Sequence, residues 1–207
     1  MFLAAAIGIT FFVYAWIRYK NNIGTRGRYE PLEKYQLDDL KSNHVRKKEI
    51  SEEYFVRPDI GRLPFMEKPD GSLARLQETV RSRASSKMIR LPKQMDNIEV
   101  KMTFGTANLE VVTQCEENYY RFIMALVSWG EQLYKEGYVK EAEEALLESV
   151  ALGSDMSRSY TLLIDLYEGR GDAEKLGELR EIVENSEALK ANSGLKIRLL
   201  DRLGGSA

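Results

Sequence analysis

The chain has 207 residues and a formal net charge of −2, with 43% hydrophobic and 30% charged residues. This size and composition allow one ordinary domain with a buried core, plus additional segments. A single cysteine and a single histidine exclude an intrachain disulfide and cannot supply the clustered ligands of a zinc site. Lys and Arg outnumber Asp and Glu over residues 18–48, whereas the reverse holds over residues 109–207. The acidic C-terminal half argues against a nucleic acid partner, because phosphates bind a basic face.

An apolar run without any charged side chain covers residues 2–17, and Arg18 and Lys20 follow it directly. At about 1.5 Å per residue, a helix extended to Lys20 approaches the ~30 Å hydrocarbon core of a bilayer. We therefore predict a transmembrane anchor over residues 1–20 that contacts membrane lipid. A cleaved signal peptide would place basic residues before the run, so it is the weaker alternative, together with a buried core helix. Because the basic residues follow the run, the positive-inside rule predicts an outer N-terminus and a cytoplasmic remainder.

Residues 21–71 are predicted to form a juxtamembrane spacer that ends in a Pro/Gly-rich loop. A helix with a narrow apolar stripe is expected to begin at Pro31, since proline is tolerated in a first turn. Pro58, Pro64 and Pro69 interrupt regular structure further along the spacer. The loop nevertheless holds several large apolar residues, too many for a simple tether. We expect them to pack on the C-terminal domain or on a partner.

An amphipathic helix and then a strand are predicted over residues 72–105. Ser72 is a suitable N-cap, and five apolar residues then fall on one helical face before Pro92, namely Leu73, Leu76, Val80, Ala84 and Met88. Four apolar residues next alternate with polar ones, as in a strand, namely Ile98, Val100, Met102 and Phe104. The alternative of equal weight is an extended linker that lies on the C-terminal domain.

The segment from Phe122 to about Asn185 matches itself at an offset of 34 residues. In each copy three apolar residues lie on one helical face, and a glycine follows where that helix should end. The matched pairs are Leu126 with Tyr160, Trp129 with Leu163, Leu133 with Tyr167, and Gly137 with Gly171. A further helix is expected from Thr106, either continuous with the first copy or separate from it.

Two antiparallel helices repeated every 34 residues resemble tetratricopeptide repeats. The first copy resembles the family through Trp129-Gly130, Leu133-Tyr134, Gly137 and Ala142, but has Gly153-Ser154 where the family usually has proline. The second copy departs from the pattern at Ile164, Leu176 and Arg180. The resemblance implies a mainly α fold with a C-terminal domain over residues 106–207. Its repeats would cover about 123–156 and 157–185, and a capping helix at about 193–203 would close the array.

In tetratricopeptide repeats the first helix of each pair lines a concave, protein-binding groove. The resemblance places nine candidate residues in that groove: Met124, Val127, Glu131, Tyr134, Lys135, Arg158, Thr161, Asp165 and Glu168. The three carboxylates would favour a basic or amphipathic partner segment. The alternative is that these are ordinary exposed residues and that binding uses another face.

No phosphate loop, dinucleotide-binding glycine pattern, nucleophile elbow or metal-ligand spacing occurs in the sequence. We therefore expect a protein without catalytic residues, cofactor or metal. The sequence predicts a single-pass, membrane-anchored adaptor whose cytoplasmic repeats bind protein subunits of a membrane complex. The alternatives are a mitochondrial import receptor for basic amphipathic segments, a secreted or periplasmic repeat protein, and a purely structural subunit.

Overall fold

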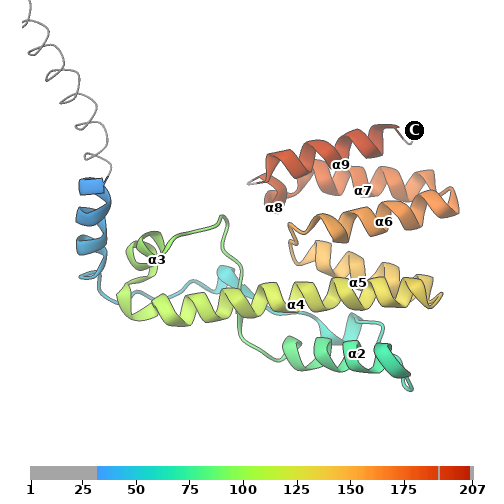
Figure 1. Cartoon of the computed structure of the whole chain (residues 1–207), viewed down its shortest axis with the longest axis horizontal. Coiled ribbons are helices and arrows are strands. Elements are labelled where there is room, and N and C mark those ends of the chain that lie inside the picture. The colour runs from blue at the N-terminus through green and yellow to red at the C-terminus, as the bar shows by residue number, and fades with distance from the viewer. Residues whose placement is uncertain (1–31, 191, 206–207) are drawn as a thin grey trace, which may run out of the picture. The chain divides into compact units, whose positions relative to one another are not determined.

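The computed structural model describes residues 32–190 and 192–205, and these are mainly helical (Figure 1). The predicted anchor over residues 1–20 lies outside the described residues. Within the described part, no helix combines the length and apolar character needed to cross a bilayer. The chain divides into two compact units, Met1–Lys48 with Asp96–Leu109, and Glu49–Met95 with Glu110–Ala207.

The first unit contains a helix over residues 32–42, helix α3 (Asn97–Phe104) and the short 3-10 helix η3 (Thr106–Asn108). Lys101 of α3 joins these elements, because its Nζ lies 3.0 Å from Asp39 Oδ1 and 2.7 Å from Asn43 Oδ1. Gly105 has a φ of +88°, and a Cβ there would lie 2.2 Å from the Arg46 carbonyl oxygen. The backbone around Arg46 therefore approaches so closely that only glycine fits.

Helix α3 stands where the sequence predicted a strand over Ile98–Phe104 or an extended linker, and both predictions are wrong. Asp96 and Glu99 form a capping box, in which Asp96 Oδ1 accepts from the Glu99 backbone N–H at 2.8 Å. Val100 and Phe104, four residues apart, are both 3% exposed. The alternating apolar residues thus include two at the four-residue spacing of one helical face. The capping box also satisfies backbone N–H groups that would need a partner strand in an extended conformation.

The second unit begins with two short strands and a helix. β1 (Phe55–Val56) lies between the 3-10 helices η1 (Glu52–Tyr54) and η2 (Ile60–Arg62), and it pairs antiparallel with β2 (Met88–Ile89). Helix α2 (Gly71–Ala84) confirms the amphipathic helix expected from Ser72, but its N-cap is Asp70. It also ends at Ala84, so Met88 belongs to β2 rather than to the helix.

The Pro/Gly-rich loop before α2 packs on the C-terminal helices. The Phe65 ring stacks on Trp129 with 5.3 Å between centroids, and the Arg81 guanidinium lies 4.7 Å from the Phe65 centroid. Gln77, only 6% exposed, exchanges two hydrogen bonds with the Met66 backbone. Residues 49–95 are therefore part of the same compact unit as the C-terminal helices, which differs from the sequence-based boundary at 105/106.

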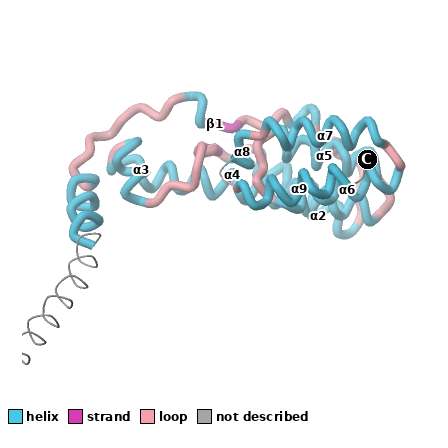
Figure 2. Tube along the Cα trace, turned by 90° about the horizontal axis from the view of Figure 1, so that it is seen from above, coloured by secondary structure: helices cyan, strands magenta, loops and turns pink. Residues whose placement is uncertain are grey.

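Two helical hairpins form the main body of this unit (Figure 1). They are α4 (Leu109–Lys135) with α5 (Val139–Ala151), and α6 (Ser157–Arg170) with α7 (Ala173–Asn185). Successive helices run in opposite directions, and α5, α6, α7 and α9 lie together when seen from above (Figure 2). The helix expected from Thr106 therefore runs, after η3, unbroken into the first hairpin.

Residues 34 positions apart occupy equivalent places in the two hairpins. Leu126 and Tyr160 are both fully buried, as are Trp129 and Leu163. Gly137 and Gly171, which follow α4 and α6, both have a positive φ. A Cβ on Gly130 would lie 2.9 Å from Leu146 Cγ, so this glycine allows α4 and α5 to approach closely.

The chain ends with α8 (Glu187–Lys190) and α9 (Ser193–Gly205). Helix α9 packs on α7 and α6, and it buries Leu195, Leu199 and Leu203 to 4% exposure or less. The terminal helix predicted over about 193–203 is confirmed. It covers the apolar side of the second hairpin, which would otherwise face water.

Candidate partner-binding face

The candidate residues of α4 and α6 recur at three- and four-residue intervals, so each set shares one side of its helix. Met124 is 46% exposed and Tyr134 38% exposed on α4. Val127, in contrast, is only 4% exposed and belongs to the hydrophobic core. Val127 is therefore not available for the apolar contact expected of it, because its position on α4 turns toward the packed helices.

An ion pair joins the two candidate sides across the hairpins. Arg158 Nη2 of α6 donates to Glu131 Oε1 of α4 at 2.5 Å, and Lys135 Nζ lies 2.9 Å from the same oxygen. Hydrogen bonds from Arg158 and then Lys135 lower the pKa of Glu131. The same contact raises the pKa of Arg158. The structure therefore brings together residues that lie 27 positions apart in the sequence.

Arg202 of α9 adds a second link, which sequence reasoning missed. Its Nη2 lies 2.5 Å from Asp165 Oδ1 and 2.7 Å from Glu168 Oε2. Hydrogen bonds to Asp165 and Glu168 raise the pKa of Arg202. The sequence indicated the terminal helix, but the side of that helix that faces α6 follows only from the packing of its leucines.

These contacts define one surface on α4, α6 and α9, which we call the ladder face. It consists of Met124, Glu131, Tyr134, Lys135, Arg158, Thr161, Asp165, Glu168 and Arg202. Its three carboxylates are matched by three basic side chains of the same chain. The groove that looked acidic in sequence is thus a charge-balanced surface, so its pull on a basic partner is weaker than the carboxylates alone would exert.

No protein-family model, curated protein or solved structure matches the chain.

Groups suited to metal or thiol chemistry contribute nothing to this face. No cluster of His, Cys, Asp and Glu that could hold a metal ion occurs among the described residues. Cys115 is buried, and burial raises the pKa of its thiol, while Lys87 lowers it to a smaller extent. A raised pKa keeps the thiol protonated near neutral pH and hence a weak nucleophile.

Proposed function

We propose that this chain is a non-enzymatic adaptor that residues 1–20 anchor in a membrane. Its tetratricopeptide-like hairpins bind a protein partner, a subunit of a membrane complex, on the cytoplasmic side. The uncharged run at residues 2–17 with basic residues after it supports the anchor and its orientation. The equivalent burial of residues 34 positions apart supports the repeat assignment.

The observation that carries the binding role is the exposure of Met124. This side chain is 46% exposed on a helix that contributes many residues to the hydrophobic core, and Tyr134 accompanies it on the same side. Flexible methionines and aromatic rings are enriched at protein interfaces, where a polar rim surrounds them. The paired charges of the ladder face form such a rim.

The balanced charges favour a particular kind of partner segment. A purely basic segment would have to compete with Arg158 and Arg202 for the carboxylates. An amphipathic segment with an apolar side chain for Met124 and charges of both signs meets no such competition. Rim charges then act mainly on association rate and selectivity, and apolar contact supplies affinity.

A matched pair of variants tests this proposal. Met124 and Val111 are 46% and 47% exposed, and they lie on roughly opposite sides of α4. We expect Met124→Glu to abolish co-purification of the partner with the full-length protein from detergent-solubilised membranes. Val111→Glu, which places the same charge on the same helix, should retain it. Both variants should keep the circular dichroism spectrum of the unaltered protein.

Retention of the partner by Met124→Glu would refute binding through the ladder face. Loss of the partner in both variants would indicate a general effect of charge on α4 and would equally refute it. Deletion of the loop over residues 54–71 would also abolish binding, but for a different reason. Phe65 and Met66 of that loop pack against the core, so the deletion would damage the fold itself.

A further inference from the structure

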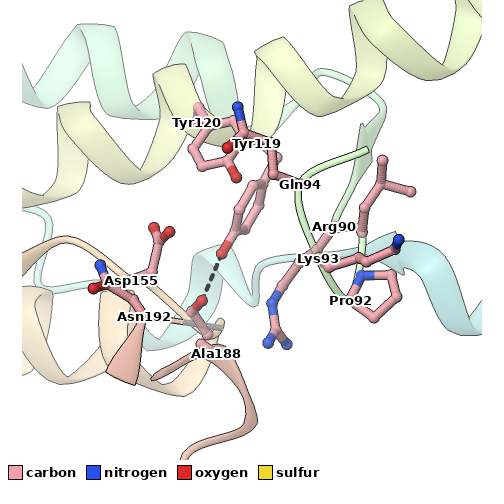
Figure 3. A pocket seen from close by; sticks show the side chains of 11 residues that line it. Arg90, Pro92, Lys93, Gln94, Tyr119, Tyr120, Asp155, Ala188 and Asn192 are labelled. Atoms are coloured by element: carbon pink, nitrogen blue, oxygen red, sulfur yellow. Dashed lines mark hydrogen bonds between the residues drawn. The ribbon is translucent and has the colours of Figure 1, made fainter. Parts of the chain in front are cut away.

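A cavity of about 290 Å³ lies within the second unit, at residues that take no part in the ladder face. Four segments form its walls (Figure 3): residues 90–94 after β2, the α4 residues Tyr119 and Tyr120, the α5–α6 connection, and the region of α8 and α9. A volume of this size lies near the lower end of small-molecule sites.

Buried tyrosines fix the α5–α6 connection that forms one wall. The Tyr119 hydroxyl lies 3.0 Å from the Gly153 carbonyl oxygen and 3.2 Å from that of Leu152, and it donates to them. The Tyr160 hydroxyl donates to the Ser154 carbonyl oxygen at 2.7 Å. Tyr119 and Tyr160 are themselves 3% and 0% exposed. This wall is therefore held in place before any ligand arrives, which lowers the ordering cost of binding.

Arg90 enters the cavity across a glycine. Gly153 has a φ of +85°, and a Cβ there would lie 2.5 Å from Arg90 Cζ, so the guanidinium rests on bare backbone. The Arg90 backbone N–H is held by the Tyr54 carbonyl oxygen at 2.9 Å. Yet the guanidinium forms neither a hydrogen bond nor an ion pair with any residue that the structure describes. The N–H donors of the guanidinium are therefore held in the cavity and remain available to a ligand.

Asp155 approaches from a different wall (Figure 3) and is likewise half-buried. Its carboxylate also has no hydrogen bond or ion pair within the described ranges 32–190 and 192–205. Burial raises the pKa of the Tyr120 hydroxyl; the Asp155 carboxylate raises it further, while Arg90 lowers it. The charges of Arg90 and Asp155 thus act on the same small volume, and neither is neutralised by direct contact.

We propose that this cavity binds an α-amino carboxylate. The ligand carboxylate accepts from the Arg90 guanidinium, and its nitrogen donates to Asp155. An apolar ligand side chain lies against the Tyr120 ring, Leu91 and Pro92. Lys93 also lines the cavity and adds a second positive charge. A simple cation would be repelled by Arg90 and Lys93, and a simple anion would leave the Asp155 carboxylate without a partner, so a ligand with both groups on one carbon satisfies the set. Such a pair of charges occurs in a free amino acid, whereas the last residue of a polypeptide carries its nitrogen as an uncharged amide.

Equilibrium dialysis of the full-length protein in detergent tests this with three related probes. L-Leucine carries both groups, L-leucine amide lacks the carboxylate, and N-acetyl-L-leucine retains the carboxylate with a peptide-like N–H. We expect saturable binding of L-leucine, about tenfold or more tighter than that of L-leucine amide or N-acetyl-L-leucine, because each analogue loses one charge-assisted contact. Equal or tighter binding of N-acetyl-L-leucine would show that Asp155 does not hold an ammonium group and would contradict the proposal.

Variants of the two charged residues tie the binding to the cavity. Arg90→Gln and Asp155→Asn should each weaken the binding of L-leucine about tenfold or more. Arg198→Gln and Asp201→Asn remove the same charges at exposed positions of α9 and should leave the affinity unchanged. Gly153→Ala should also weaken binding, because its Cβ displaces Arg90. Gly171 also has a positive φ but has open space around it, so Gly171→Ala is the control for backbone strain without a steric clash.

The proposal is overturned by three results. These are the absence of saturable binding of L-leucine, equal binding of L-leucine amide or N-acetyl-L-leucine, and unchanged affinity for L-leucine in Arg90→Gln or Asp155→Asn. None of these outcomes affects the adaptor role, because Met124 and the ion pairs of the ladder face lie outside the cavity walls.

Discussion

Trp129 is the residue on which the two parts of the second unit meet. It is fully buried in α4, and Phe65 from the loop before α2 stacks on its ring. Its Nε1–H is buried and has no hydrogen-bond partner among the described residues. The indole therefore stabilises the fold by apolar packing, while its N–H opposes folding through lost hydration.

Replacement of Trp129 separates these two effects. Trp129→Ala should lower the free energy of unfolding by roughly 3–5 kcal/mol, a large share of the ~5–15 kcal/mol typical of a domain. Trp129→Phe should lower the free energy of unfolding clearly less, since phenylalanine keeps an aromatic ring and removes the unsatisfied N–H donor. Urea unfolding of the full-length protein, followed by far-UV circular dichroism, measures both. An unchanged midpoint in Trp129→Ala would show that α4 does not pack in this register.

The ion pairs of the ladder face act differently from the core. Glu131 and Arg158 keep side-chain exposures of 24% and 55%, and Arg202 keeps 36%. Exposed pairs of this kind contribute only about 0–1 kcal/mol each, because water and salt screen them. Their effect is to set the charge pattern that a partner meets, not to hold the helices together.

At the scale of single elements, local caps and long-range packing contribute separately. Helix α3 is short, and its N-terminus is closed by the capping box of Asp96 and Glu99. The position of helix α9, by contrast, depends on three leucines that pack on the second hairpin. A change at a cap should therefore loosen one helix, whereas a change in the leucines should expose the end of the domain.

The capping box gives a local prediction. Asp96→Ala should weaken α3 by about 1 kcal/mol, because the Glu99 backbone N–H loses its acceptor. Amide hydrogen exchange should show faster exchange over residues 98–104, with the amides of α6 and α7 unchanged. Asn97→Ala changes the neighbouring residue without touching the cap and is the control. Equal protection of α3 in both variants would mean that the cap does not stabilise this helix.

For the whole molecule, the adaptor proposal depends on where the chain resides. The described residues form two compact units, and in the sequence the uncharged run at residues 2–17 precedes the described residues of both. A tether of this kind would confine the ladder face to a membrane surface and raise its effective concentration toward partners there. That advantage exists only if the run is inserted and retained.

Membrane insertion predicts a definite fractionation result. The full-length protein should remain in the membrane pellet after an alkaline carbonate wash, because a spanning helix is held by the hydrophobic effect and not by charge. A variant without residues 2–17 should be released. Protease added outside intact cells should leave the ladder face undigested. Release of the full-length protein, or digestion from outside, would contradict the anchor or its orientation respectively.

The sequence by itself determined the elements whose pattern is local. The 34-residue offset located α4 to α7, and the leucine spacing located α9, because a helix buries one face at a 3.6-residue period regardless of its neighbours. The α3 helix was also encoded locally, in the Asp96–Glu99 cap, but the apolar alternation over Ile98–Phe104 concealed it. Local patterns therefore predicted most of the helices and the α4 and α6 sides of the ladder face.

Only the tertiary structure decided how distant segments meet. Arg202 reaches Asp165, Phe65 stacks on Trp129, and Arg90 rests on Gly153, each across more than thirty residues of chain. No periodicity records such contacts, because they depend on which faces the helices turn toward one another once their apolar sides are buried. The same packing removed Val127 from the predicted groove and balanced its carboxylates. It also left Arg90 and Asp155 without protein partners in a cavity that no sequence pattern indicated.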